Sequence, residues 1–287
     1  MKSNNITVGA IKEVRSFFMA IPALLWQILF LYIPLLFIIG ISFLRSFDVT
    51  AIQTITIKNY QVLLQFSYVK IIARSLLLAL FTAIFCFFIS YPVAYFLALK
   101  VKKMKNLLLF FLALPFWTNF IVQVYAWFFI LDRHGFLNKI LLKLGVITGP
   151  LHILNTPVAI YIVMLFCYIP FMVMPLYTSL SKIDTYLLEA SFDLGANPWQ
   201  TFFNITFPLS TTGIKTGFFL VFIPSFGEFV IPALLGGSKT LYVGSMISYF
   251  FLETRNIFLG SAFTCVSMIC LVCAALIIHL IFKKLFS

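Results

Sequence analysis

Long runs of apolar residues, separated by short clusters of charged and polar residues, make up most of this chain. A helix needs about 20 apolar residues to cross the roughly 30 Å of hydrocarbon in a bilayer. The runs therefore predict an all-α polytopic membrane protein with six transmembrane helices in one domain, residues 1–287, and with both termini on the same side. We expect the spans at about 17–43, 75–99, 107–131, 156–180, 211–235 and 257–282.

A long polar stretch, residues 182–210, carries start and stop signals for two short helices. Asp184 is a typical N-cap for a helix through about Leu194, and Gly195 follows where a left-handed residue ends a helix. The Asn197-Pro198 pair is typical of an N-cap and first helical position, and we expect this second helix to end before Pro208. The stretch therefore predicts a helical hairpin with a glycine bend.

Each helix of this hairpin has an apolar face. Such a hairpin either docks into a groove of a partner protein or lies on the membrane surface as an interfacial loop without a partner. Periodicity alone leaves both interpretations open. The residues of the two faces are Leu187, Ala190, Ser191 and Leu194 in the first helix, and Trp199, Phe202 and Phe203 in the second.

Composition supports a membrane protein and excludes other classes. Hydrophobic residues make up 62% of the chain and charged residues 10%, which excludes a soluble core covered by polar surface. The net charge of +12 does not indicate nucleic acid, because the basic residues lie beside apolar runs and form no aromatic-interleaved stripe. We expect membrane lipid around the spans and no nucleic-acid partner.

Lysine and arginine residues predict the orientation, because cytoplasmic loops carry an excess of them. With cytoplasmic termini, eleven basic residues fall inside and nine outside, and the loop 100–105 alone holds four lysines. We therefore expect both termini, and with them residues 182–210, on the cytoplasmic side.

Glu228 lies inside the fifth apolar run. A carboxylate facing lipid there costs at least a few kcal/mol, so it faces either a cavity or a partner. Residues 224–232, bounded by two prolines, predict a locally unwound helix that aims Glu228 inward. Aromatic side chains can complete a cation site by cation–π attraction. The residues expected beside Glu228 are Trp117, Tyr125, Trp127, Tyr161 and Tyr168.

Other roles remain open for these side chains. Glu228 can instead form a structural hydrogen bond or an ion pair with another helix. Aromatic residues make up 18% of the chain, and any one of them can face lipid or anchor at the interface.

The sequence lacks the motifs of nucleotide-binding and catalytic sites. No Gly-x-x-x-x-Gly-Lys-Ser/Thr segment occurs, so the chain itself cannot cradle nucleotide phosphates. Cys270 and Cys273 form a C-x-x-C pair inside an apolar run, without the second pair or the histidines of a zinc site. We expect a non-catalytic chain that binds no cofactor and no metal. An ion channel or a membrane-embedded enzyme remains an alternative.

The polar stretch also carries a family motif. Glu189-Ala190-Ser191, three residues, Gly195, nine residues and then Ile205-Thr206-Phe207-Pro208 resembles the Glu-Ala-Ala-x3-Gly-x9-Ile-x-Leu-Pro signature of binding-protein-dependent ABC importer permeases of bacteria. Ser191 and Phe207 depart from that signature. The resemblance implies a type I ABC importer permease fold, with residues 182–210 as the cytoplasmic coupling loop. The residues that it implies for contact with the ATPase, or for the shape of the loop, are Glu189, Ala190, Gly195, Trp199, Phe202, Phe203, Ile205 and Pro208.

Three further stretches resemble the spermidine/putrescine permease branch of this family: residues 130–138, residues 227–241, and Arg255-Asn256 followed by residues 259–262. The resemblance implies transport of polyamines across the bacterial inner membrane, with Glu228 facing the cation. It also implies two ATPase subunits that use ATP and Mg, a second homologous permease and a periplasmic substrate-binding protein. Related permeases for iron(III), thiamine, sulfate or molybdate share much of the pattern, so these substrates are the alternatives.

Overall fold

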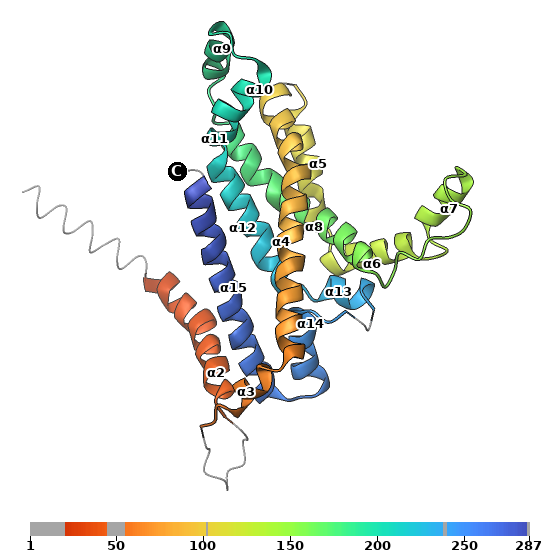
Figure 1. Ribbon diagram of the computed structural model, residues 1–287, viewed down its shortest axis with the longest axis vertical. Coiled ribbons are helices and arrows are strands. Elements are labelled where there is room, and N and C mark those ends of the chain that lie inside the picture. The colour runs from red at the N-terminus through yellow and green to blue at the C-terminus, as the bar shows by residue number, and fades with distance from the viewer. Residues whose placement is uncertain (1–20, 45–54, 102, 238–239, 286–287) are drawn as a thin grey trace, which may run out of the picture.

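The computed structural model describes residues 21–44, 55–101, 103–237 and 240–285, and all regular elements within these ranges are helical (Figure 1). The first expected span therefore begins, at residues 17–20, outside the described part. The longest helices are α4 (Phe66–Tyr95), α8 (Pro157–Leu180) and α15 (Ile257–Leu285). The shorter helices are α2 (Ile33–Ser42), α3 (Lys58–Leu63), α5 (Lys105–Trp117), α6 (Phe120–Leu131), α7 (Phe136–Lys143), α9 (Thr185–Asp193), α10 (Pro198–Thr201), α11 (Phe207–Leu209), α12 (Thr211–Gly227), α13 (Val230–Leu235) and α14 (Val243–Ser248). Four π-helices adjoin them: η1 (Ile28–Tyr32), η2 (Phe96–Lys100), η3 (Phe202–Thr206) and η4 (Tyr249–Glu253).

Helices α4, α8 and α12 form the buried core of the fold. Small residues allow this close packing, as they do in many membrane helices. A Cβ atom on Gly213 would lie 2.6 Å from Cβ of Ser179 and 2.7 Å from the carbonyl oxygen of Pro175, so α12 approaches α8 almost backbone to backbone. Gly217, one turn further on, makes the same kind of approach to Met172.

The remaining long helices lie at the periphery. Within the described ranges, four helices are long and apolar enough to cross a membrane by themselves: Ile21–Ser42, Phe66–Lys100, Pro157–Leu180 and Ile257–Leu285. The first of these packs against α15 at one side of the bundle (Figure 1). Few residues of either helix are buried, as expected for surfaces that face lipid or another membrane protein.

The expected span 107–131 is not one straight helix. Helix α5 ends at Trp117 and α6 begins at Phe120. The segments Lys105–Trp117 and Phe120–Lys143, the second of which includes α7, meet at 94°. Pro115 removes a backbone donor shortly before the break, and Thr118 and Asn119 are extended. The sequence analysis did not place this break, because a proline in an apolar run can kink a helix as well as end it.

The break expected in the fifth apolar run lies where the prolines predicted it. Helix α12 ends at Gly227, Glu228 is extended, and the short α13 begins at Val230. Helix α13 packs against α6, so the two helix breaks lie near each other in the fold.

Candidate functional site

The hairpin of residues 182–210 lies at one end of the helix bundle (Figure 1). Oδ1 of Asp184 accepts a 3.0 Å hydrogen bond from the backbone N–H of Tyr186 and caps α9. Gly195 has φ of +85°, the left-handed conformation that favours glycine. Asn197 and Gln200 form a reciprocal capping box of two 2.9 Å hydrogen bonds at the start of α10. Local sequence signals therefore predicted both helix starts and the bend.

A buried pair of hydroxyls joins the two helices of the hairpin. Oγ of Ser191 donates to the carbonyl oxygen of Leu188 at 2.8 Å, which uses its single hydrogen. The hydroxyl of Thr201 therefore donates the 2.8 Å hydrogen bond between Oγ1 of Thr201 and Oγ of Ser191. Serine at this position, where the family signature has alanine, thus fixes α10 against α9.

The second hairpin helix does not end before Pro208, contrary to the sequence prediction. Helix α10 continues through the π-helix η3 into α11, which contains Pro208. Proline lacks the N–H of a helical hydrogen bond, and its ring collides with the preceding turn of an α-helix. The wider π-turn just before Pro208 leaves room for that ring, so the chain stays helical up to α12.

Most residues of the two predicted apolar faces are exposed on the outside of the hairpin. Leu187 and Leu194 are exposed, and it is Ser191 that is buried. Trp199 and Phe203 stack at 6.1 Å between ring centroids and are also exposed. Around them, Glu189, Ala190, Gly195 and Pro208 are exposed as well, and Ile205 is half-buried.

Phe202 points the other way and anchors the hairpin to α4. Its ring lies 5.6 Å from that of Tyr91 and 6.1 Å from that of Tyr95, in edge-to-face geometry. The hydroxyl of Tyr91 is hydrogen-bonded to Oγ of Ser210 at 3.0 Å, just before α12 begins. The hairpin is therefore attached to both core helices, α4 and α12.

A second candidate site surrounds Glu228. Its Oε1 accepts hydrogen bonds from the backbone N–H groups of Val230 at 2.9 Å and Ile231 at 3.4 Å, and thereby caps α13. Its Oε2 accepts a 3.1 Å hydrogen bond from the hydroxyl of Tyr168 on α8. The carboxylate thus makes structural hydrogen bonds and also borders a cavity.

This cavity, of about 390 Å³, lies between the two helix breaks. Among the described residues that line it, Glu228 is the only acidic or basic side chain. Aromatic rings form much of the wall, and the rings of Phe116 and Phe171 meet edge to face at 4.7 Å. The lining residues are Pro115, Phe116, Thr118, Phe120, Gln123, Cys167, Tyr168, Phe171, Pro224 and Glu228.

Side-chain amides hold the α5–α6 break opposite Glu228. Oδ1 of Asn119 caps α6 by accepting from the N–H groups of Ile121 at 2.9 Å and Val122 at 3.4 Å. Nε2 of Gln123 donates to the carbonyl oxygen of Pro115 and to Oγ1 of Thr118. The sequence analysis missed Gln123, although an amide one turn after a Pro-x-x-Thr-Asn segment was a usable signal.

Most of the aromatic residues expected beside Glu228 lie elsewhere. Of these five residues, Tyr168 contacts the carboxylate. Trp117 is 76% exposed and contacts Phe110, and Tyr125 is exposed on α6. Trp127 packs against Phe166 and Tyr161 against Phe85. Phe116, Phe120 and Phe171, which the sequence analysis did not select, take their place in the cavity wall.

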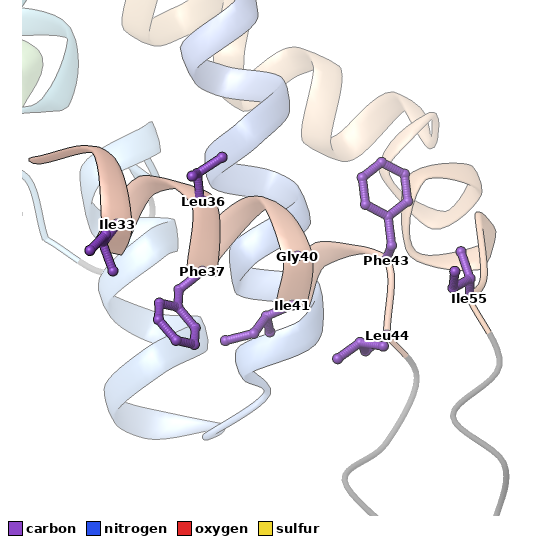
Figure 2. A pocket seen from close by; sticks show the side chains of 8 residues that line it. All are labelled: Ile33, Leu36, Phe37, Gly40, Ile41, Phe43, Leu44 and Ile55. Atoms are coloured by element: carbon purple, nitrogen blue, oxygen red, sulfur yellow. The ribbon is translucent and has the colours of Figure 1, made fainter. Parts of the chain in front are cut away.

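A larger apolar groove runs along α2, with a volume of about 1080 Å³ (Figure 2). Its lining side chains carry no polar group that could recognise a cation, and most of them belong to α2, which packs on α15. We therefore do not assign it to the transported molecule. The residues that line it are Ile33, Leu36, Phe37, Gly40, Ile41, Phe43, Leu44 and Ile55.

Known proteins resemble this chain in sequence and in fold. Residues 90–287 match the family described as "Binding-protein-dependent transport system inner membrane component". The spermidine/putrescine transport system permease protein PotB of Salmonella typhimurium is 43% identical over 238 residues, which cover 83% of each chain. This similarity confirms the resemblance found in the sequence motifs.

Solved structures show the same fold. A chain of a bacterial ABC transporter involved in the import of the acidic polysaccharide alginate matches with a TM-score of 0.75 and 16% identity, over 99% of this chain and 100% of that chain. A second alginate transporter structure, in complex with an alginate pentasaccharide-bound periplasmic protein, gives a TM-score of 0.74 and 16% identity over 96% of each chain. The predicted all-α permease fold is thereby confirmed.

Proposed function

Because this chain belongs to the family of binding-protein-dependent transport system inner membrane components, we propose that it is the permease subunit of an ATP-driven importer of polyamines such as spermidine or putrescine. The observation that carries the cargo assignment is Glu228, a single carboxylate in an aromatic-walled cavity between two helix breaks. Broken helices that surround a binding site are a recurring device of transporters.

The chemistry of this cavity favours a cation. A carboxylate in a largely apolar surrounding attracts an ammonium group more strongly than it would in water. The rings of Tyr168 and Phe171 lie 5.9 Å apart on the same wall and can add cation–π attraction. The same carboxylate repels sulfate and molybdate, so among the alternatives only the cationic cargoes, thiamine and iron(III), suit this site.

Energy for transport comes from separate ATPase subunits, since the sequence holds no P-loop. We place the contact with one of them on the exposed surface of the hairpin, around Glu189, Trp199 and Phe203. The 17 residues of α12 extend about 25 Å from Ser210 to the break at Glu228. A displacement of the hairpin is therefore transmitted to the cavity by a single helix, α12. Gly213 and Gly217 allow this helix to pack tightly against α8.

The remaining partners follow from the same proposal. A second, homologous permease completes the translocation path, and a periplasmic binding protein delivers the cargo to the outer face. The hairpin and both termini lie in the cytoplasm. Two features support this orientation. The C-terminal end of α15 lies at the same end of the bundle as the hairpin (Figure 1), and loop 100–105 carries basic residues. The chain itself has no catalytic role and binds neither the ATP nor the Mg that the ATPases use.

Uptake of radiolabelled spermidine tests the proposal, in cells that make the chain together with its native partner subunits. Glu228→Gln keeps the size and most hydrogen-bonding capacity of the side chain but removes its charge, and we expect uptake to fall at least ten-fold. The matched control is Glu253→Gln, at an exposed position at the end of η4, which should leave uptake unchanged. Unimpaired uptake by Glu228→Gln, or uptake of thiamine or iron(III) in place of spermidine, would overturn the cargo assignment.

A further inference from the structure

Glu228 by itself has little capacity left for a ligand. An ionised carboxylate offers roughly four acceptor positions on its two oxygens. Two backbone N–H groups occupy Oε1, and the Tyr168 hydroxyl occupies one position on Oε2. A primary ammonium group has three N–H donors. The cavity must therefore supply a second acceptor, because unpaired donors in a buried site are costly.

The side chain of Gln123 supplies that acceptor. Both hydrogens of its amide nitrogen are used, one on the carbonyl oxygen of Pro115 and one on Oγ1 of Thr118. The Thr118 hydroxyl in turn donates to the same Pro115 oxygen at 2.9 Å, so its oxygen is available to accept. Turning the amide around would place its own oxygen against the Pro115 oxygen, two acceptors facing each other. The amide orientation is therefore fixed.

This orientation leaves Oε1 of Gln123 without a hydrogen-bond partner among the described residues. Gln123 borders the cavity together with Glu228, and it comes from the opposite helix break. The site thus presents one charged acceptor, Oε2 of Glu228, and one neutral acceptor, Oε1 of Gln123, within a wall of aromatic rings.

We propose that Gln123 is a cargo-binding residue whose amide oxygen, together with Oε2 of Glu228, holds one primary ammonium group at a time. This inference rests on the proposed polyamine transport and extends it. With a single negative charge, the cavity neutralises one end of a polyamine, and the methylene chain lies against the rings of Phe116 and Phe171. The cargo then passes the helix breaks one amino group after another.

Three substitutions distinguish a role of Gln123 in cargo binding from a role that only stabilises the helix break. Gln123→Lys keeps N–H donors for Pro115 and Thr118 but places a cation at the acceptor position. Gln123→Glu keeps acceptor oxygens but loses the donors. Gln123→Leu removes both the donors and the acceptor. If the leucine variant does not assemble, Gln123→Met is used in its place, because methionine is similar to glutamine in length and volume. Spermidine uptake is measured at a series of concentrations and expressed per assembled transporter.

An acceptor role predicts that Gln123→Glu, which keeps an acceptor for the ammonium group but loses the donors to Pro115 and Thr118, transports spermidine less well than the wild type and better than Gln123→Leu. Gln123→Leu should raise the half-saturating concentration about ten-fold, as expected for loss of one hydrogen bond to a charged group, and Gln123→Lys should abolish uptake. If Gln123→Glu is no better than Gln123→Leu, or if Gln123→Lys transports normally, the proposal is wrong and Gln123 only holds the break. Failure of polyamine transport itself has a different signature, because the wild type then takes up no spermidine or Glu228→Gln is unimpaired.

Discussion

The hydroxyl of Tyr168 donates a 3.1 Å hydrogen bond to Oε2 of Glu228 and so connects the middle of α8 to the break between α12 and α13. The other carboxylate oxygen caps α13, so one side chain organises both the helix break and the cavity wall. A half-buried carboxylate that is hydrogen-bonded at both oxygens in this way keeps a fixed position as the helices move, which a binding site requires.

Removal of the Tyr168 hydroxyl should weaken this arrangement. We expect Tyr168→Phe to lower the free energy of unfolding by about 1 kcal/mol and to reduce polyamine uptake several-fold, because the carboxylate loses its only side-chain donor among the described residues. Tyr161→Phe is the matched control, since Tyr161 lies on the same helix but contacts Phe85. Equal uptake by the two variants would contradict a role for the hydroxyl in positioning Glu228.

The exposed stacked pair on the hairpin should govern association with the ATPase. We expect Trp199→Ala to reduce the amount of ATPase that co-purifies with the permease about ten-fold, because exposed aromatic side chains dominate interface energies. Trp117→Ala is the control: Trp117 is 76% exposed and Trp199 73%, but Trp117 lies at the α5–α6 break and not on the hairpin. If both variants retain the ATPase equally, the proposed contact surface is wrong.

The close approach of α12 to α8 should make Gly213 sensitive to a single methyl group. A Cβ atom at this position would collide with the Pro175 backbone and with Cβ of Ser179, neither of which can move without separating the helices. We expect Gly213→Ala to cost about 2 kcal/mol and to lower the apparent Tm of the purified protein by about 5 °C. Gly40→Ala, where an added Cβ meets nothing within 4 Å, should leave the Tm unchanged.

The hydrogen bond between Tyr91 and Ser210 should be measurable as an energetic coupling. Oγ of Ser210 also donates to the carbonyl oxygen of Phe207 at 2.9 Å, so Tyr91 is the donor in the 3.0 Å contact. A double-mutant cycle with Tyr91→Phe and Ser210→Ala should give a coupling of about 1 kcal/mol in unfolding experiments.

The control for that cycle pairs Tyr91→Phe with Ser267→Ala. Ser267 is a buried residue of α15 whose hydroxyl has no hydrogen-bond partner among the described residues, and its effect should simply add to that of Tyr91→Phe. Additive effects in the Tyr91 and Ser210 cycle as well would show that this contact does not fasten the hairpin to α4.

Sequence patterns predicted those features that depend on neighbouring residues. The caps at Asp184 and Asn197 and the bend at Gly195 are local, since each needs only a few consecutive residues to form. The break at Glu228 was also predictable, because two prolines and a carboxylate in an apolar run all disfavour a continuous helix. The continuation of the hairpin helix through Pro208 was not, because the π-turn that accommodates this proline leaves no distinct signal in the residues.

The sequence by itself therefore determined the class of protein, the number of apolar runs and the hairpin with its family motif, because run length and helix capping act over short distances. Only the tertiary structure decided which polar groups share the cavity. Tyr168, Gln123 and Glu228 come from three separate helical segments, and their meeting depends on the chain break between α5 and α6 and on the close packing of α12 against α8. The sequence shows which residues can attract a cation, but it does not show which of them meet in the fold, and so Trp117 and Tyr161 were expected in the cavity wall in place of Phe116 and Phe171.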